Sequence, residues 1–220
     1  MKRLAGMCVL AGLTIALCGA VAHGSFSNPP LDGGGSGVSD FGDGQQEADD
    51  FALGAPSSID QVRWWGSYGA TPDPAPADDF LVRLYNDVAG APAVNPFSEI
   101  AVNPTRAATA LTASVFGGHD GGTVYEYVAS LPAPVGLSGG TTYYLSIVNN
   151  TATSRWGWLE DGDGPHWWRS SEGSVWALSG RNTNFAFELS EVNIIPAPGA
   201  LLLGALGTGL VGWMRRRRAM

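Results

Sequence analysis

Short apolar stretches separated by turn-forming residues dominate the middle of this chain. In most of them apolar and polar residues alternate, which is typical of β-strands. No window of about 11 residues or more there shows the 3.6-residue period of a helix. Gly, Pro, Asn and Asp interrupt the stretches roughly every ten residues, a spacing typical of antiparallel sandwiches and barrels. The predicted strands are Phe51–Leu53, Gln61–Tyr68, Phe80–Tyr85, Ser98–Val102, Ala110–Val115, Thr123–Leu131, Thr142–Val148, Arg155–Leu159, Ser174–Leu178 and Asn184–Leu189.

We therefore predict an all-β fold, an antiparallel jelly-roll-like β-sandwich, over residues 48–191. Alternation assigns the faces of its clearest strand. Phe80, Val82 and Leu84 share one face, which we expect to be inward, while Arg83 and Tyr85 point the other way. The same reasoning predicts a second inward-facing set, which comprises Phe185, Phe187 and Leu189.

One further stretch, Thr142–Val148, is apolar on both faces, so it is predicted to be a central strand. By contrast, residues 23–47 are rich in Gly, Ser, Asp and Gln and hold few large apolar groups. We expect this segment to be a flexible lead-in or a loop that caps the domain.

The N-terminus has the three parts of a secretory signal. Lys2 and Arg3 are basic, Leu4–Leu17 is apolar, and Ala20–Ala22 supplies a small-residue cleavage pattern before His23. We predict a signal peptide over residues 1–22, with an uncleaved anchor as the alternative. A lipoprotein signal ending at Cys18 is less favoured, because the bulky Leu17 precedes it.

Both cysteines of the chain, Cys8 and Cys18, lie inside this signal, so the exported body has no disulfide. Of 12 basic residues, 2 lie in the signal and 4 near the C-terminus, and all 20 acids lie between, so the body carries 6 − 20 = −14. This charge argues against nucleic acid as a partner and is compatible with divalent cations.

The C-terminal residues 192–220 form a second targeting segment. From Pro198 to Met214 the chain has 17 residues and no charged side chain. A helix of that length spans ~25 Å, near the short limit for crossing a bilayer. The arginines at 215–218 then act as a cytoplasmic anchor. The simplest interpretation is a short membrane anchor.

The motif Pro196-Ala197-Pro198, the apolar run over about 198–214, and Arg215, Arg216, Arg217 and Arg218 together resemble the PEP-CTERM sorting signal of Gram-negative bacteria. The same tail also carries the label "ice-binding protein C-terminal domain". In that family a Glu usually stands where this chain has Ala197. The resemblance covers about residues 194–218. It implies recognition by an exosortase, a membrane-embedded sorting protease, transient contact with the inner membrane, and release or attachment at the cell surface.

Seven tryptophans lie in the body, at 64, 65, 156, 158, 167, 168 and 176. Most are expected in the core, because a sandwich without cysteines needs large apolar side chains. Adjacent strand residues face opposite sides, so one member of each Trp pair should lie off the core. The candidate glycan contacts are Trp65, Trp167 and Trp168, since indole rings stack on sugars.

An acidic run, Glu160–Gly164, contains Asp161 and Asp163 and resembles a calcium loop, although Asp-Gly pairs are also common in hairpin turns. We keep both interpretations open and expect no other cofactor. The chain has no nucleophile elbow, no zinc-protease motif and no phosphate loop. A hydrolase would need a pocket with convergent acids, or with His119 or His166 beside them.

We therefore expect no enzyme but an exported structural or adhesive protein of the cell surface or of an exopolysaccharide matrix. The alternative is a carbohydrate-binding module that uses exposed tryptophans, with or without structural calcium.

Overall fold

The computed structural model of this chain describes residues 25–69, 78–116, 119–150 and 155–191. The predicted signal peptide over 1–22 and the sorting tail over 192–220, with its expected membrane helix over 198–214, lie outside these ranges. Within them the chain is all-β, and no helix has the length and apolarity needed to cross a membrane.

Twelve strands make up the described part of the chain. In chain order they are β1 (Phe26–Asn28), β2 (Ser36–Val38), β3 (Gln46–Ala52), β4 (Ser57–Ser67), β5 (Phe80–Asn86), β6 (Ser98–Val102), β7 (Thr105–Phe116), β8 (His119–Leu137), β9 (Thr142–Asn149), β10 (Gly157–Arg169), β11 (Ala177–Phe185) and β12 (Phe187–Ser190).

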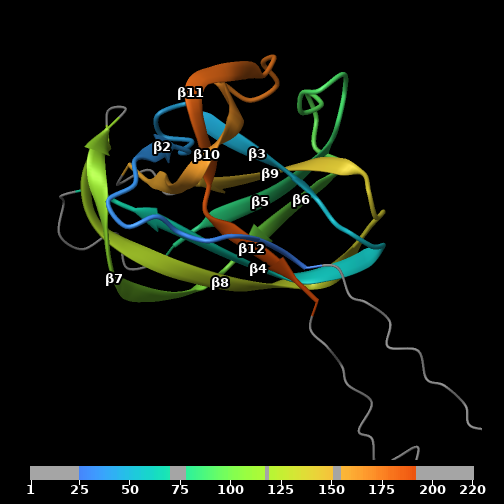
Figure 1. Cartoon of the computed structure of the whole chain (residues 1–220), viewed down its shortest axis with the longest axis horizontal. Helices are drawn as coiled ribbons and strands as arrows, with labels where there is room; N and C mark the ends of the chain where they lie inside the picture. The colour runs from blue at the N-terminus through green and yellow to red at the C-terminus, as the bar shows by residue number, and fades with distance from the viewer. Residues whose placement is uncertain (1–24, 70–77, 117–118, 151–154, 192–220) are drawn as a thin grey trace, which may run out of the picture.

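The strands form two antiparallel layers (Figure 1). The β3 sheet has the order β11-β10-β3-β9-β5-β6. In the β4 sheet, β4 lies between β8 and β12, with β7 beyond β8 and β1 beyond β12. Strand β10 belongs to both layers, because its first residues pair with β4 and β2 and its later ones with β3 and β11. The predicted central strand is confirmed, since β9 lies between β3 and β5.

A single large core fills the space between the two layers, as in a β-sandwich. Both sheets contribute aromatic rings to it, and Trp64 of β4 stacks on Tyr127 of β8 with ring centroids 5.4 Å apart. Phe80 of β5 meets the same Trp64 edge-on at 5.4 Å. The two predicted inward-facing sets are confirmed as core residues: Phe80, Val82 and Leu84, and Phe185, Phe187 and Leu189.

The outer face of the β3 sheet is covered rather than exposed. Tyr85 packs edge-on against Trp176, and Arg83 is buried beside it on β5. The connections over 87–97 and 170–176 lie over this face, because Trp176 donates its indole N–H to the Ala93 carbonyl at 3.1 Å. Arg83 and Tyr85 therefore do point away from the core, as predicted, but into a second buried layer.

The prediction of a flexible lead-in over 23–47 is wrong for the described residues 25–47. They form β1, β2 and the start of β3, and the side chains of Ser39 and Asp40 are buried. The Asp40 carboxylate accepts hydrogen bonds from the Asn149 side chain at 2.7 Å and from the Trp156 amide at 3.1 Å. Glycine here serves close packing, because a Cβ atom at Gly37 would lie only 2.6 Å from the Phe185 ring.

Strand boundaries near the C-terminus also differ from the prediction. Strand β10 continues to Arg169 instead of ending at Leu159, because β-bulges absorb its Gly and Pro residues within the pairing to β11. Residues 174–176 belong to the turn after it, so the strand expected over 174–178 begins only at Ala177.

Candidate functional site

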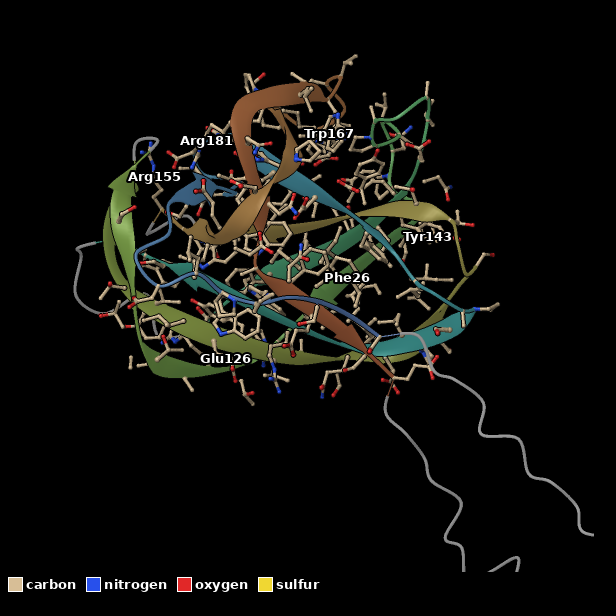
Figure 2. All side chains as sticks on the ribbon, viewed as in Figure 1. Phe26, Glu126, Tyr143, Arg155, Trp167 and Arg181 are labelled. Carbon is tan, nitrogen blue, oxygen red and sulfur yellow. The ribbon has the colours of Figure 1, made fainter. Side chains whose placement is uncertain are left out.

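A hollow of about 270 Å³ opens where β3, β10 and β11 lie side by side. We call it the Trp168 pocket. Six residues line it: Gln45, Glu47, His166, Trp168, Ser179 and Arg181. In Figure 2 the labelled Arg181 lies at the end of the molecule formed by β10 and β11.

Strand register brings the pocket residues together from distant parts of the chain. Trp168 of β10 pairs directly with Glu47 of β3, so both side chains lie on the same face of the sheet. His166 lies two residues earlier and shares that face, while Trp167 between them points to the opposite side. The Trp168 side chain is 40% exposed and presents its indole at the edge of the pocket.

Glu47 lies at the floor of the pocket with 3% of its surface exposed. Its Oε1 accepts a hydrogen bond from the Gln45 side-chain amide at 2.8 Å. Its Oε2 is buried and has no hydrogen-bond partner among the described residues. Burial raises the pKa of the Glu47 carboxyl to about 8, because the Gln45 hydrogen bond and the Arg181 charge offset only part of the desolvation. The carboxyl is therefore mainly protonated at neutral pH.

His166 lies beside Glu47, and only 1% of its surface is exposed. Its Nδ1 lies 2.6 Å from the Thr183 carbonyl oxygen, which can only accept, so Nδ1 carries the proton and donates. Its Nε2 lies 3.7 Å from Oε2 of Glu47. Burial lowers the pKa of His166, although the hydrogen bond to Thr183 acts in the opposite direction. The two groups thus form an uncharged pair at neutral pH.

Arg181 supplies the positive charge of the pocket wall. Its guanidinium forms an ion pair with Glu160 of β10, which neutralises this charge locally. The Arg181 backbone N–H also donates to the hydroxyl of Ser179 at 3.2 Å. The pocket therefore combines an exposed indole, a neutral carboxyl, a neutral imidazole and a paired cation, a set suited to an uncharged polar ligand.

Two of the three predicted glycan contacts are not available at the surface. Trp65 is only 5% exposed and belongs to a small core cluster with Leu159 and Ala186 on the far face of the β4 sheet. Trp167 is 8% exposed and packs edge-on against Tyr144 at 4.9 Å. Trp168 alone of the predicted contacts is open to solvent, and six of the seven body tryptophans are buried as expected.

The acidic run over residues 160–164 lies within strand β10. Asp161 and Asp163 lie within the bulged part of β10, and no group of three or more metal-ligating side chains is found in the described ranges. Burial raises the pKa of Asp161 to about 6, only partly offset by hydrogen bonds from its own backbone and from Gly162. Calcium at Asp161 and Asp163 stays a prediction.

Sequence reasoning missed Glu47 and considered His166 only as a hydrolase candidate. The sole signal for Glu47 was its place in the run 46–52, where side chains alternate between the two faces of β3. His166, which lies beside Glu47 in the pocket, is 119 residues further along the chain. Only the register of β3 with β10 brings the two side chains together. His119 begins β8, and its side chain lies outside the described part of the structure.

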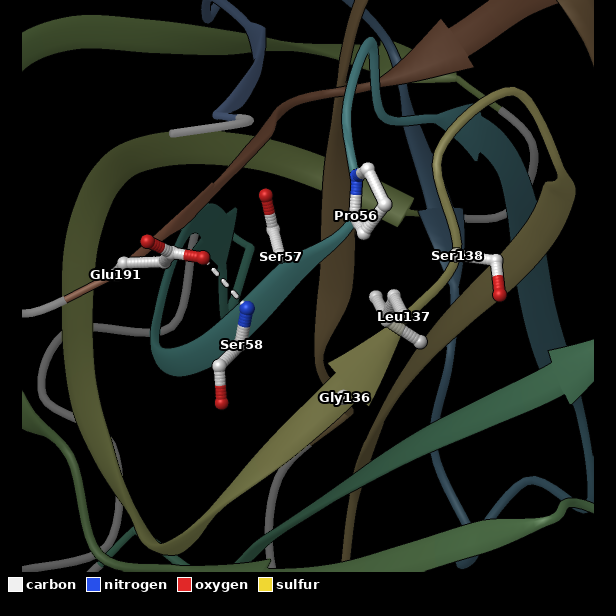
Figure 3. A pocket seen from close by; sticks show the side chains of 7 residues that line it. All are labelled: Pro56, Ser57, Ser58, Gly136, Leu137, Ser138 and Glu191. Atoms are coloured by element: carbon white, nitrogen blue, oxygen red, sulfur yellow. Dashed lines mark hydrogen bonds between the residues drawn. The ribbon is translucent and has the colours of Figure 1, made fainter. Parts of the chain in front are cut away.

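A second hollow, of about 560 Å³, lies at the end of β12 (Figure 3). It is open and shallow, and its lining residues are Pro56, Ser57, Ser58, Gly136, Leu137, Ser138 and Glu191. The Ser58 backbone N–H donates to the Glu191 carboxylate at 2.5 Å. None of the residues that line it is aromatic, so it is a weaker candidate for ligand binding than the Trp168 pocket.

Comparison with known proteins places the whole described domain in one family. No curated protein matches the chain. Residues 25–193 match the family described as "Domain of unknown function (DUF7901)", and this match begins just before β1 and ends just after β12. The chain therefore belongs to the DUF7901 family.

Proposed function

We propose that this protein is an exported, non-catalytic component of the cell envelope or its surrounding matrix that adheres to glycans through the Trp168 pocket. The observation that carries the proposal is the exposed indole of Trp168 beside a hollow lined by five polar residues. Aromatic rings stack on the apolar faces of sugars, and convergent polar groups fix the orientation of a ligand.

The placement of the chain ends supports a role in surface display. Strands β1 and β12 are antiparallel neighbours, with Phe26 opposite Leu189, so both ends of the domain leave at the same place. In Figure 1 this place lies at the lower right, while β10 and β11 lie at the top. A domain held at its ends would thus present the pocket away from its attachment.

Export and sorting are part of the same proposal. The signal over 1–22 would deliver the chain across the inner membrane, and an exosortase would recognise the tail with Pro196, Ala197, Pro198 and the arginines at 215–218. The expected partners are this protease, the inner membrane during sorting, and an exopolysaccharide or other glycan. We further propose that the strands are connected as in a jelly roll and that a structural calcium ion binds at Asp161 and Asp163.

Affinity electrophoresis in gels that contain soluble polysaccharides tests the binding proposal. The domain should be retarded by at least one neutral polysaccharide, and Trp168→Ala should migrate as it does in a gel without ligand. Leu178→Ala is the matched control, because Leu178 is an exposed apolar residue on β11 outside the lining of the pocket. Equal retardation of the wild type and Trp168→Ala would refute the site.

A further inference from the structure

We propose that the Trp168 pocket selects an uncharged sugar residue, with Glu47 donating a hydrogen bond to a ligand hydroxyl and His166 accepting one from it. This inference rests on the proposed glycan binding and adds the class of sugar and the residues that choose it. It comes from three features of the pocket: the fixed tautomer of His166, the unpartnered oxygen of Glu47, and the neutralised charge of Arg181.

The first feature fixes which nitrogen of His166 can act on a ligand. Because Nδ1 donates to the Thr183 carbonyl at 2.6 Å, the neutral ring has its lone pair on Nε2. The ring is held in this orientation by Phe185, whose centroid lies 4.8 Å away at an interplanar angle of 60°. His166 therefore offers an acceptor to the pocket and not a donor.

The second feature is a donor that lacks a partner. Oε2 of Glu47 is buried and has no hydrogen bond within the described part of the chain, and its distance of 3.7 Å from Nε2 of His166 exceeds that of an ordinary hydrogen bond. At this separation a third oxygen atom can lie ~2.8 Å from both atoms, off the line that joins them. A hydroxyl there accepts from the protonated carboxyl and donates to Nε2, which satisfies both groups at once.

The third feature excludes a charged sugar. The titratable groups near Glu47 are His166 on β10, Arg181 on β11, the Glu160 that pairs with Arg181, and Asp49 two residues along its own strand. Arg181 is the sole cation among the six lining residues, and its charge is already matched by Glu160. A uronic acid would bring a carboxylate into a site with no free cation, at the energetic cost of an unpaired buried charge.

The net charge of the domain also disfavours the binding of negatively charged sugars. Between residues 25 and 191 the chain has 6 arginines, no lysine and 20 acids, so its charge is 6 − 20 = −14 with ionised carboxyls. Long-range repulsion would reduce association with anionic polysaccharides, whereas neutral polysaccharides are unaffected.

Isothermal titration calorimetry on the body of the protein, residues 23–191, tests this inference. The ligands are neutral gluco-, manno- and xylo-oligosaccharides and, for contrast, oligouronates from alginate and polygalacturonate. Titrations at pH 7 and pH 9 compare the wild type with Glu47→Gln, whose amide can still donate but cannot ionise. Glu126→Gln, a substitution on β8 at the opposite end of the view in Figure 2, is the matched control.

Wild-type affinity for the neutral ligand should fall about tenfold between pH 7 and pH 9, as the protonated fraction of Glu47 falls. Glu47→Gln should bind equally at both pH values, Glu126→Gln should behave as the wild type, and oligouronates should not bind.

Two results separate a failure of this inference from a failure of the proposed function. Suppose that Trp168→Ala abolishes binding. If the affinity of Glu47→Gln then still falls between pH 7 and pH 9 as that of the wild type does, or if oligouronates bind as well as neutral ligands, the inference is wrong and glycan binding stands. If no saccharide binds the wild type at all, the proposed function itself is wrong.

Discussion

Gly66 of β4 lies directly against the indole of Trp156. A Cβ atom at position 66 would lie 2.3 Å from Cζ2 of that ring, a distance that real contacts do not reach. Trp156 has no room to retreat, because it is fully buried and meets Phe80 edge-on with centroids 5.0 Å apart. The absence of a side chain at position 66 is therefore a packing requirement of the core.

We expect Gly66→Ala to lower the free energy of unfolding by about 1–3 kcal/mol, the usual cost of overpacking. Equilibrium denaturation in urea measures this change. Gly136→Ala is the matched control, because Gly136 also lies in a strand and a Cβ atom there would meet nothing within 4 Å. Equal stability of the two variants would contradict the packing described for the core.

Gln46 holds the two buried arginines on the outer face of the β3 sheet. Its Oε1 accepts from Nε of Arg169 at 2.8 Å and from Nη1 of Arg83 at 3.1 Å. We expect Gln46→Ala to lower the free energy of unfolding by about 2–4 kcal/mol, because both charged donors lose an acceptor in a buried site. Thermal or chemical denaturation checks this. Gln61→Ala, at a partly exposed position of β4, should change stability by less than about 0.5 kcal/mol.

Glu47 should make the protein less stable as the pH rises. Its pKa of about 8 in the folded state lies above the ordinary value of 4.5, so the folded protein binds more protons between these two values. The free energy of unfolding therefore falls as the pH rises through this window. Glu47→Gln removes this effect, and we expect its melting temperature to exceed that of the wild type at pH 8.5 but by less at pH 5. A constant difference across that range would show that Glu47 does not titrate as described.

Local alternation was enough to predict the strands that carry the core. Phe80, Val82 and Leu84 follow a period of two, and this pattern alone places them on one face. Alternation cannot tell whether the other face is covered, so the burial of Arg83 and Tyr85 under two connections could not be predicted from it.

The candidate site was less accessible to sequence reasoning. Trp168 was one of three predicted contacts, but the neighbouring Trp167 has the same residue type and the opposite orientation. Only the tertiary structure shows that β10 continues past its Gly and Pro residues and which of the two rings meets solvent. Glu47 joins the site through pairing between strands far apart in the chain, which no local pattern encodes.

Sorting through the C-terminal tail predicts a processed protein in the native host. Intact mass spectrometry should find a mature form that lacks residues 1–22 and the tail. A variant without Arg215–Arg218 should accumulate in the membrane fraction with its tail uncleaved, because the exosortase would lack the arginine cluster of its recognition motif. A wild-type protein that keeps residues 195–220 at the inner membrane would show that Ala197 prevents processing, and the tail would then be a plain anchor.

The most direct test of the glycan-binding account is calorimetric titration of wild-type protein and Trp168→Ala with the neutral oligosaccharide that binds best. Because Trp168 is a partly exposed residue, its removal should leave the melting temperature nearly unchanged while the affinity falls at least about tenfold, or ~1.4 kcal/mol. Trp167→Ala should instead destabilise the fold by about 3–5 kcal/mol. Unchanged affinity in a folded Trp168→Ala variant would contradict the account.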